Sequence, residues 1–163
     1  MVLLVMFCFI GSIGVLSQTP PKAPADFVAF LVRADAAQVE LQNGQAANYK
    51  KLWSHADDVT ISGGFGGTIE RGWDAVGSRL DWAGTQFSNG TNTIDRLSAV
   101  ADKKYGYVVQ LEHIKFKVPG TGADATRDFR VTLIFRREKD GWKIVHRHAD
   151  GQIKKEPSSK SNQ

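Results

Sequence analysis

Four long segments with the composition of β-strands make up the second half of the chain and constrain its fold more than any other feature. They span about 91–102, 105–118, 127–138 and 141–152. The sequences between them are typical of turns: Lys103-Lys104, Pro119-Gly120-Thr121-Gly122 and Asp140-Gly141. Strands joined by such short connections pair in antiparallel order. We therefore predict an antiparallel meander of four strands.

Three helices are predicted before these strands. The first begins at Asp26, which can cap it, and ends at Asn43-Gly44. The second is short, over about 46–54, and the third starts at Gly72. Apolar residues with helical spacing define the two longer helices: Phe27, Phe30, Leu31, Ala34 and Leu41 in the first, and Trp73, Val76, Leu80, Ala83 and Phe87 in the third. Helices followed by a meander predict an α+β fold in which a curved sheet wraps the helices.

One domain is expected from length and composition. The chain has 163 residues, of which 42% are apolar and 23% are charged, and these values are ordinary for a globular domain. Part of the net charge of +4 comes from lysines in the tail 153–163, which we expect to be disordered. Acidic and basic residues are mixed elsewhere, so no nucleic-acid partner is predicted.

Residues 1–17 are almost wholly apolar and read as a signal peptide or a short anchor. A proline-rich linker, residues 18–25, separates them from the domain at 26–152. Ser17 is small enough for cleavage after it, although no Lys or Arg precedes the apolar run. We expect export to a periplasm or secretion, with membrane contact only through an uncleaved segment. Cys8 is the only cysteine, so no disulfide is predicted in the mature domain.

The position of the turn between the last two strands determines which of their side chains share a face of the sheet. A two-residue turn at Asp140-Gly141 would place Leu133 opposite His148. One face would then carry Phe129, Val131, Leu133, Phe135, Trp142, Ile144, His146 and His148, and the other Arg130, Thr132, Ile134, Arg136, Val145, Arg147 and Ala149. A β-bulge would break this assignment. Neither face is fully polar, so we expect helices to cover one and a partner subunit to cover the other.

The order of elements and two motifs resemble a known family. Residues 56–61, Ala-Asp-Asp-Val-Thr-Ile, precede a flexible glycine-rich loop, and the last strand reads Gly-Trp-Lys-Ile-Val-His-Arg-His-Ala. The pattern, over about Asp26 to Gln152, is similar to SnoaL-like domains of the nuclear transport factor 2-like superfamily. That superfamily also contains ketosteroid isomerases and the calmodulin-dependent kinase association domain.

The resemblance implies a cone-shaped α+β fold, with three N-terminal helices packed in a curved antiparallel sheet. It also implies a small-molecule pocket between helices and sheet, and a homodimer through the outer face of the sheet. By the same resemblance, pocket residues fall at Thr132, Val145, Arg147 and Ala149, while His146 and His148 fall on the outer face.

Catalytic residues of the superfamily are not matched in this sequence. The general base of the isomerases corresponds to about Gly63, and their two oxyanion-stabilising residues correspond to about Thr132 and Val39. The acid/base aspartate of the related cyclases corresponds to about Arg147. A glycine cannot accept a proton and an arginine stays protonated. Whether the protein is an enzyme therefore stays open, and isomerase activity by that route is not expected.

Two arginines, a histidine and a tryptophan are candidates for the pocket. Arg130 and Arg147 could clamp a carboxylate, because guanidinium presents a planar fork to that group, or they could form ion pairs at the sheet edge. By the resemblance, His113 also projects into the pocket, as an acid/base candidate or a structural residue. Trp82 belongs either to an aromatic ligand box or to the core.

A metal site is a further alternative. His146 and His148 share one face of a strand, and Glu112 could join them from a neighbouring strand. The competing interpretation is that both histidines pack in an interface or at the edge of the core. No cofactor motif is present, so no cofactor is predicted.

Three functions remain as hypotheses. The first is an exported domain that binds a small, anionic organic ligand through Arg130 and Arg147. The second is a lyase or isomerase that acts on a small carbonyl compound through His113 and a pocket arginine. The third is a non-catalytic dimerisation or assembly module that uses the outer face of the sheet.

Overall fold

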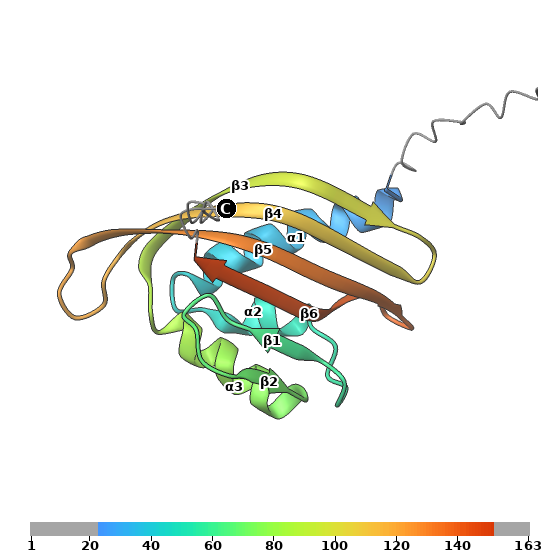
Figure 1. Ribbon diagram of the computed structural model, residues 1–163, viewed down its shortest axis with the longest axis horizontal. Helices are drawn as coiled ribbons and strands as arrows, with labels where there is room; N and C mark the ends of the chain where they lie inside the picture. The colour runs from blue at the N-terminus through green and yellow to red at the C-terminus, as the bar shows by residue number, and fades with distance from the viewer. Residues whose placement is uncertain (1–22, 152–163) are drawn as a thin grey trace, which may run out of the picture.

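The computed structural model describes residues 23–151, which fold around one six-stranded sheet (Figure 1). Its strands lie in the order β2-β1-β6-β5-β4-β3. Their bounds are β1 (Thr60–Ser62), β2 (Ile69–Arg71), β3 (Ser88–Ala101), β4 (Tyr105–Lys117), β5 (Asp124–Glu138) and β6 (Gly141–Gly151). The expected signal segment and C-terminal tail lie outside the described residues.

The predicted α+β fold is confirmed, and the sheet is larger than expected. β3 to β6 form the antiparallel meander, but the short strand β1 pairs in parallel with β6, so the sheet is mixed. β2 then extends the same edge as the antiparallel partner of β1. β3 and β5 begin earlier than predicted, at Ser88 and Asp124, because each continues the pairing with β4 through polar residues that carry no strand signal of their own.

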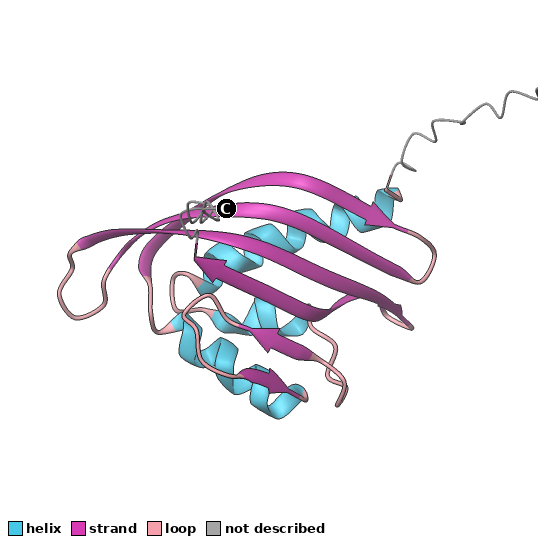
Figure 2. Ribbon diagram, in the orientation of Figure 1, coloured by secondary structure: helices cyan, strands magenta, loops and turns pink. Residues whose placement is uncertain are grey.

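Three helices complete the domain: α1 (Ala25–Leu41), α2 (Ala46–Lys51) and α3 (Trp73–Gly84). Figure 2 shows α1 lying across one face of the sheet and α3 packed near the β2 edge. Asp26 was predicted to cap α1, which is wrong: Pro24 holds the cap position, and Asp26 accepts a hydrogen bond from the Phe27 N–H within the first turn. No helix in residues 23–151 has the length and apolarity that a bilayer crossing requires.

The core lies between α1 and the sheet. The rings of Phe27 and Phe30 pack edge-on against Phe135, with centroids 5.2 and 5.7 Å apart, and Phe27 also contacts Trp142 at 4.9 Å. Burying each phenylalanine side chain contributes about 1.5–3 kcal/mol. We call the helix side of the sheet its covered face and the other side its open face.

The turn between β5 and β6 differs from the predicted one. Glu138 pairs with Gly141, so Lys139 and Asp140 form the two-residue loop. Gly141 has a φ of 120°, which favours glycine at this position. The predicted turn at Asp140-Gly141 is therefore displaced by one residue.

A β-bulge in β6 then changes which side chains share a face. Phe135 pairs with Ile144, whereas the preceding residue Ile134 pairs with His146, which leaves Val145 as the extra residue of the bulge. Each residue beyond the bulge consequently faces the side opposite to the one that unbroken alternation would give it.

The bulge brings Arg147 onto the covered face. Leu133, which is buried, pairs with Arg147, and Thr132 pairs with His148 on the open face. The predicted pairing of Leu133 with His148 is wrong because the displaced turn and the bulge both shift the register. Arg130 and Thr132, which were grouped with Arg147, lie on the open face instead.

Candidate functional site

A cavity of about 60 Å³ lies between the helices and the covered face of the sheet. Residues from all three helices and from β1, β4, β5 and β6 line it, and the partly exposed loop 63–67 forms its rim. The lining residues are Gln38, Leu41, Gln42, Tyr49, Ile61, Gly63, Gly64, Phe65, Arg79, Leu80, Ala83, Phe87, Ile114, Phe129 and Arg147. The wall is mostly apolar, with a few polar groups, which is the usual composition of a small-molecule site.

A buried ion pair forms the polar end of this cavity. Arg147 donates two hydrogen bonds to Glu112, Nη1 to Oε1 at 2.9 Å and Nη2 to Oε2 at 2.8 Å. Glu112 is 0% exposed and also accepts hydrogen bonds from the side-chain amides of Gln38 at 2.6 Å and Gln110 at 2.8 Å. The carboxylate is thus held by four donors, which fixes the arginine in one orientation.

Both members of the pair are charged. Burial opposes ionisation of Glu112, but the charge and hydrogen bonds of Arg147 outweigh it and hold the pKa of Glu112 below its ordinary value. Burial would likewise lower the pKa of Arg147, whereas the Glu112 carboxylate raises it. Burial raises the pKa of Tyr49, which neighbours Arg147, to about 12, so the phenol stays protonated at neutral pH.

Gln42 adds a polar group without a protein partner. Its side chain is 1% exposed, yet its amide oxygen makes no hydrogen bond with any residue in the described part of the chain. An unpaired buried polar atom costs free energy, and because this oxygen is an acceptor, only a hydrogen-bond donor in the cavity can relieve that cost. Tyr49, Gln42 and Arg147 therefore offer hydrogen-bonding groups within one cavity wall.

Arg79 supplies a second positive charge from α3. Its Nη2 donates to the carbonyl oxygen of Gly66 at 2.7 Å, and its guanidinium lies 4.4 Å above the ring of Trp82. The nearest acidic group is Glu70, whose Oε1 lies 4.0 Å away. One Glu70 oxygen is buried without a partner among the described residues, so this charge pair is incomplete.

Gly63 makes room for the Arg79 guanidinium. A β-carbon built on Gly63 would lie 2.9 Å from Nη2 of Arg79, which is too close. Gly63 is also where the isomerase resemblance places the general base. The cavity therefore has a cation beside the position where that mechanism needs a carboxylate.

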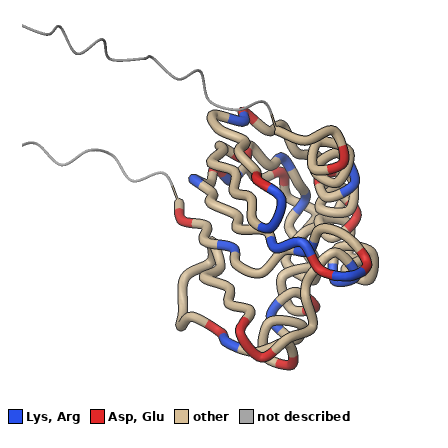
Figure 3. The backbone as a smooth tube through the Cα atoms, turned by 90° about the vertical axis from the view of Figure 1, so that its right-hand side faces the viewer, with Lys and Arg blue, Asp and Glu red and all other residues tan. Residues whose placement is uncertain are grey.

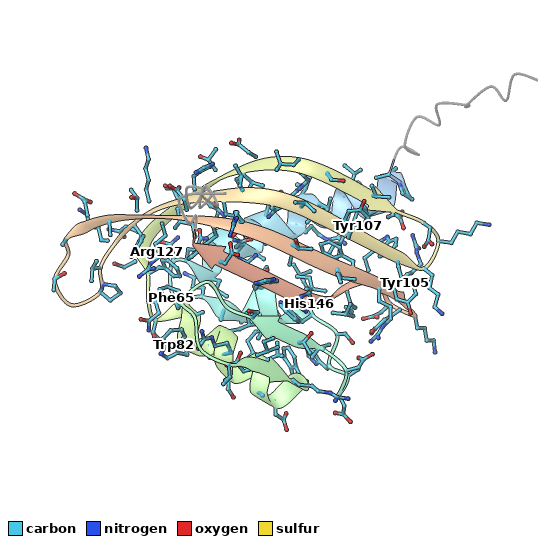
Figure 4. The ribbon with its side chains drawn as sticks, in the orientation of Figure 1. Phe65, Trp82, Tyr105, Tyr107, Arg127 and His146 are labelled. Atoms are coloured by element: carbon cyan, nitrogen blue, oxygen red, sulfur yellow. The ribbon has the colours of Figure 1, made fainter. Side chains whose placement is uncertain are left out.

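The ring of Phe65 covers the rim of the cavity. It packs edge-on against Trp82 at 5.4 Å and also contacts Phe87 and Phe129. The guanidinium of Arg127, on β5, lies over its other side at 4.5 Å. Figure 4 shows Phe65 between Arg127 and Trp82.

Comparison of the sequence with models of known protein families identifies the family of this chain. The model of the SnoaL-like domain matches residues 34–149, most of the chain. The chain belongs to the SnoaL-like domain family. No functionally curated protein matches the sequence.

Solved structures share the SnoaL-like fold of this chain. A protein of the nuclear transport factor 2-like family from Streptomyces avermitilis has a TM-score of 0.68 at 19% identity, over 81% of this chain and 100% of that one. A ketosteroid isomerase-like protein from Erwinia carotovora atroseptica gives 0.66 at 12%, over 80% and 96%. The CaMKII hub of S. rosetta gives 0.59 at 20%, over 81% and 99%. At such identities the likeness establishes the fold alone.

The structure places one of the two predicted arginines at the cavity of this SnoaL-like domain. Arg147 lines it, although its fork is already occupied by Glu112. Arg130 lies on the open face, where it pairs with Asp150 at 2.9 Å. Thr132 is also on the open face, so both residues were wrongly assigned to the pocket, because the prediction contained no bulge.

His113 is not a pocket residue either. On β4 the buried side chains are those of even-numbered residues, including Glu112, and His113 points to the open face. Its ring contacts Asp128 at 2.7 Å and Asp95 at 3.4 Å. The predicted place of His113 in the pocket is therefore wrong, since the sheet separates His113 from the cavity.

The three weak metal candidates do not converge. His146 bonds to the Thr60 hydroxyl at 2.7 Å on the open face, next to His148, whereas Glu112 is buried on the covered face. Within residues 23–151 no cluster of three or more metal-ligating side chains is present.

The remaining predicted positions do not line the cavity. Val145 is the bulge residue, packed against the core, and Ala149 is buried on the covered face. Trp82 is 42% exposed at the rim beside Phe65 and Arg79, so it is neither a core residue nor part of an enclosed aromatic box.

Arg79 and Gln42 were not predicted as site residues. A signal existed for both: Arg79 follows Val76 by three positions on the apolar stripe of α3, and Gln42, the C-cap of α1, follows Gln38 by four. A polar residue at helical spacing within a buried stripe indicates a polar contact inside the fold.

Proposed function

We propose that this SnoaL-like domain binds a small organic anion, with a carboxylate as the simplest case, in the cavity between its helices and sheet. Arg79 and Arg147 provide the positive charge, and the protonated hydroxyl of Tyr49 can donate a further hydrogen bond. The observation that carries the proposal is the charge of the lining: it contains two arginines, and among the described residues no acidic side chain lines it.

The carboxylates that partner these arginines lie outside the cavity wall. Glu112 is fully buried behind Arg147, and Glu70 stands 4.0 Å from Arg79. An anion in the cavity would therefore meet the guanidinium groups first. In a site that excludes most water such contacts are stronger than on the surface.

Binding fits this geometry better than isomerase-type proton abstraction. A general base must lie within hydrogen-bond reach of the substrate proton, and the position expected for it is Gly63, with the Arg79 guanidinium alongside. The proposal therefore assigns no catalytic step to these residues.

The test is a thermal-shift comparison of hexanoate with hexanamide, which has nearly the same shape without the charge. Hexanoate is expected to raise the melting temperature of the wild type, and hexanamide is not. Arg79→Gln should abolish the response. Arg130→Gln, a matched change on the open face, should leave it intact. Equal responses to acid and amide, or loss of response in Arg130→Gln alone, would refute the proposal.

Assembly through the open face is a second candidate function. Leu97, Tyr105, Tyr107 and Ile134 are exposed large apolar side chains, between 39% and 67% accessible, and such surface favours association. One structural neighbour is a CaMKII hub. Light scattering at micromolar concentration should give a particle mass at least twice that of one chain. The double variant Leu97→Lys, Tyr107→Lys should have a lower mass. A monomeric wild type would rule out this second function.

We also propose that the protein is exported, on the basis of the apolar run at residues 1–17. The expected first residue of the processed protein is Gln18. N-terminal sequencing of protein recovered from expressing cells checks this, and an intact N-terminus would argue against a cleaved signal.

A further inference from the structure

We propose that the ligand is an acid with an extended apolar body, whose head enters the cavity while the body lies in an outer groove, and that the Phe65 ring is the gate between the two. The inference rests on the proposed anion-binding function and adds the class of ligand and a second subsite.

The small size of the cavity is the reason for placing the head and the body of the ligand in two different sites. Its volume of about 60 Å³ has room for only a few water-sized groups. Sites that enclose an organic ligand usually measure about 300–1,000 Å³. The cavity can therefore take a carboxylate and little more, so the rest of any larger ligand must lie outside it.

A groove of suitable size adjoins the cavity at Phe65. It measures about 590 Å³ and is formed by the β4–β5 hairpin together with the end of α3. Its lining combines apolar side chains with polar ones: Phe116, Val118, Pro119 and Ala125, and Thr85, Gln86, Thr126 and Arg127. Phe65 lines both hollows, so its ring is the partition between them.

The loop that carries Phe65 is rich in glycine. Glycines flank the ring on both sides, and Gly66 and Gly67 have φ of 77° and 96°, which glycine adopts without strain. Gly64 approaches so closely that an added β-carbon would lie 2.5 Å from the Phe129 ring. Rotation of this short loop can swing the Phe65 ring without moving the sheet.

Arg79 links the gate to the anion site. Its hydrogen bond to the Gly66 carbonyl holds the loop in the observed position. A carboxylate that binds Arg79 competes with the Gly66 carbonyl for the same guanidinium. Binding of the carboxylate therefore weakens the hydrogen bond that holds the loop, and the Phe65 ring can move aside for the rest of the ligand. Binding of the head and displacement of the ring are thereby coupled.

The experiment measures the affinity of straight-chain acids by calorimetry, using acetate, butanoate, hexanoate and octanoate. Each methylene beyond the cavity is expected to tighten binding by about threefold to fourfold, until the groove is filled. Ala125→Trp, which fills the groove from β5, should remove this gain while leaving acetate unchanged. Thr132→Trp on the open face is the matched control and should change nothing.

Kinetics test the gate separately. Phe65→Ala should speed the association of octanoate by several-fold in stopped-flow measurements, with a smaller effect for Phe65→Leu. Circular dichroism confirms that the variants are folded. An unchanged association rate in Phe65→Ala would overturn the gate.

The outcomes separate this inference from the function on which it rests. If acids bind with an affinity independent of chain length, or if Ala125→Trp leaves the chain-length gain intact, the outer groove is not the subsite, although anion binding stands. If no acid binds, the proposed function and this inference both fail.

Discussion

At the residue scale, the ion pair of Arg147 and Glu112 is the interaction on which site and stability both depend. Glu112→Gln keeps the shape of the side chain but leaves a buried arginine without its counter-charge. We expect a loss of about 3–5 kcal/mol in the free energy of unfolding, measured by denaturant titration. Asp150→Asn removes the partner of the exposed Arg130 and should cost far less. Equal losses in the two variants would contradict this account of the pair.

His113 gives the open face a pH-dependent contribution to stability. The hydrogen bond to Asp128 raises the pKa of His113 above its ordinary value of 6.5, with a further contribution from Asp95. A raised folded-state pKa means that this stabilisation is fully present below pH 6.5 and is lost as pH rises through the folded value.

His113→Gln should therefore flatten this part of the curve of unfolding free energy against pH. Hexanoate binding should be unchanged in the same variant, because His113 lies across the sheet from the cavity. A variant whose pH profile matches that of the wild type would show that His113 contributes no such linkage.

At the scale of elements, the helices and the meander could be predicted from the sequence because each has its own periodicity. The stripe beginning at Phe27 and the alternation along β4 each report which side is buried. Turn sequences located the hairpins to within a few residues. The segment Val59-Thr60-Ile61 reads as β-like and lies at β1, but β2 could not be found in this way, since three residues carry too little periodicity.

The site was harder to predict, because one residue of β6 decides it. Val145 carries no mark that distinguishes a bulge from a regular strand position, yet the bulge reverses the face of every residue after it. Arg147 was placed in the pocket by family resemblance, and hairpin register alone grouped it with Arg130. The pairing with Glu112 depends on packing between distant strands, which local sequence does not specify.

The glycine-rich loop offers a test of how α3 and the sheet edge shape the site. Gly63→Ala places a methyl group against the mobile end of Arg79, so the side chain can move aside and stability should change little. Hexanoate should bind more weakly, because the guanidinium leaves the cavity wall. Unfolding and binding measured on the same preparation check this, and undiminished binding would contradict the role given to Arg79.

At the scale of the whole molecule, the fold separates two surfaces with different chemistry. The covered face, with the helices, encloses the arginine-lined cavity, and the open face carries exposed apolar side chains and paired charges. Figure 3 shows basic and acidic residues interspersed along the backbone, so the charge of the cavity is a local property of Arg79 and Arg147. A bound anion would thus be recognised by the cavity rather than by a general surface field.

The most direct measurement is a titration of the protein with hexanoate while the arginine Nε–H signals are followed by NMR. The signals of Arg79 and Arg147 should shift and saturate together, and those of Arg130 and Arg136, which are held in ion pairs away from the cavity, should stay in place. Saturable shifts at Arg130 without any at Arg79 and Arg147, or no saturable shift at any arginine, would contradict anion binding in the cavity.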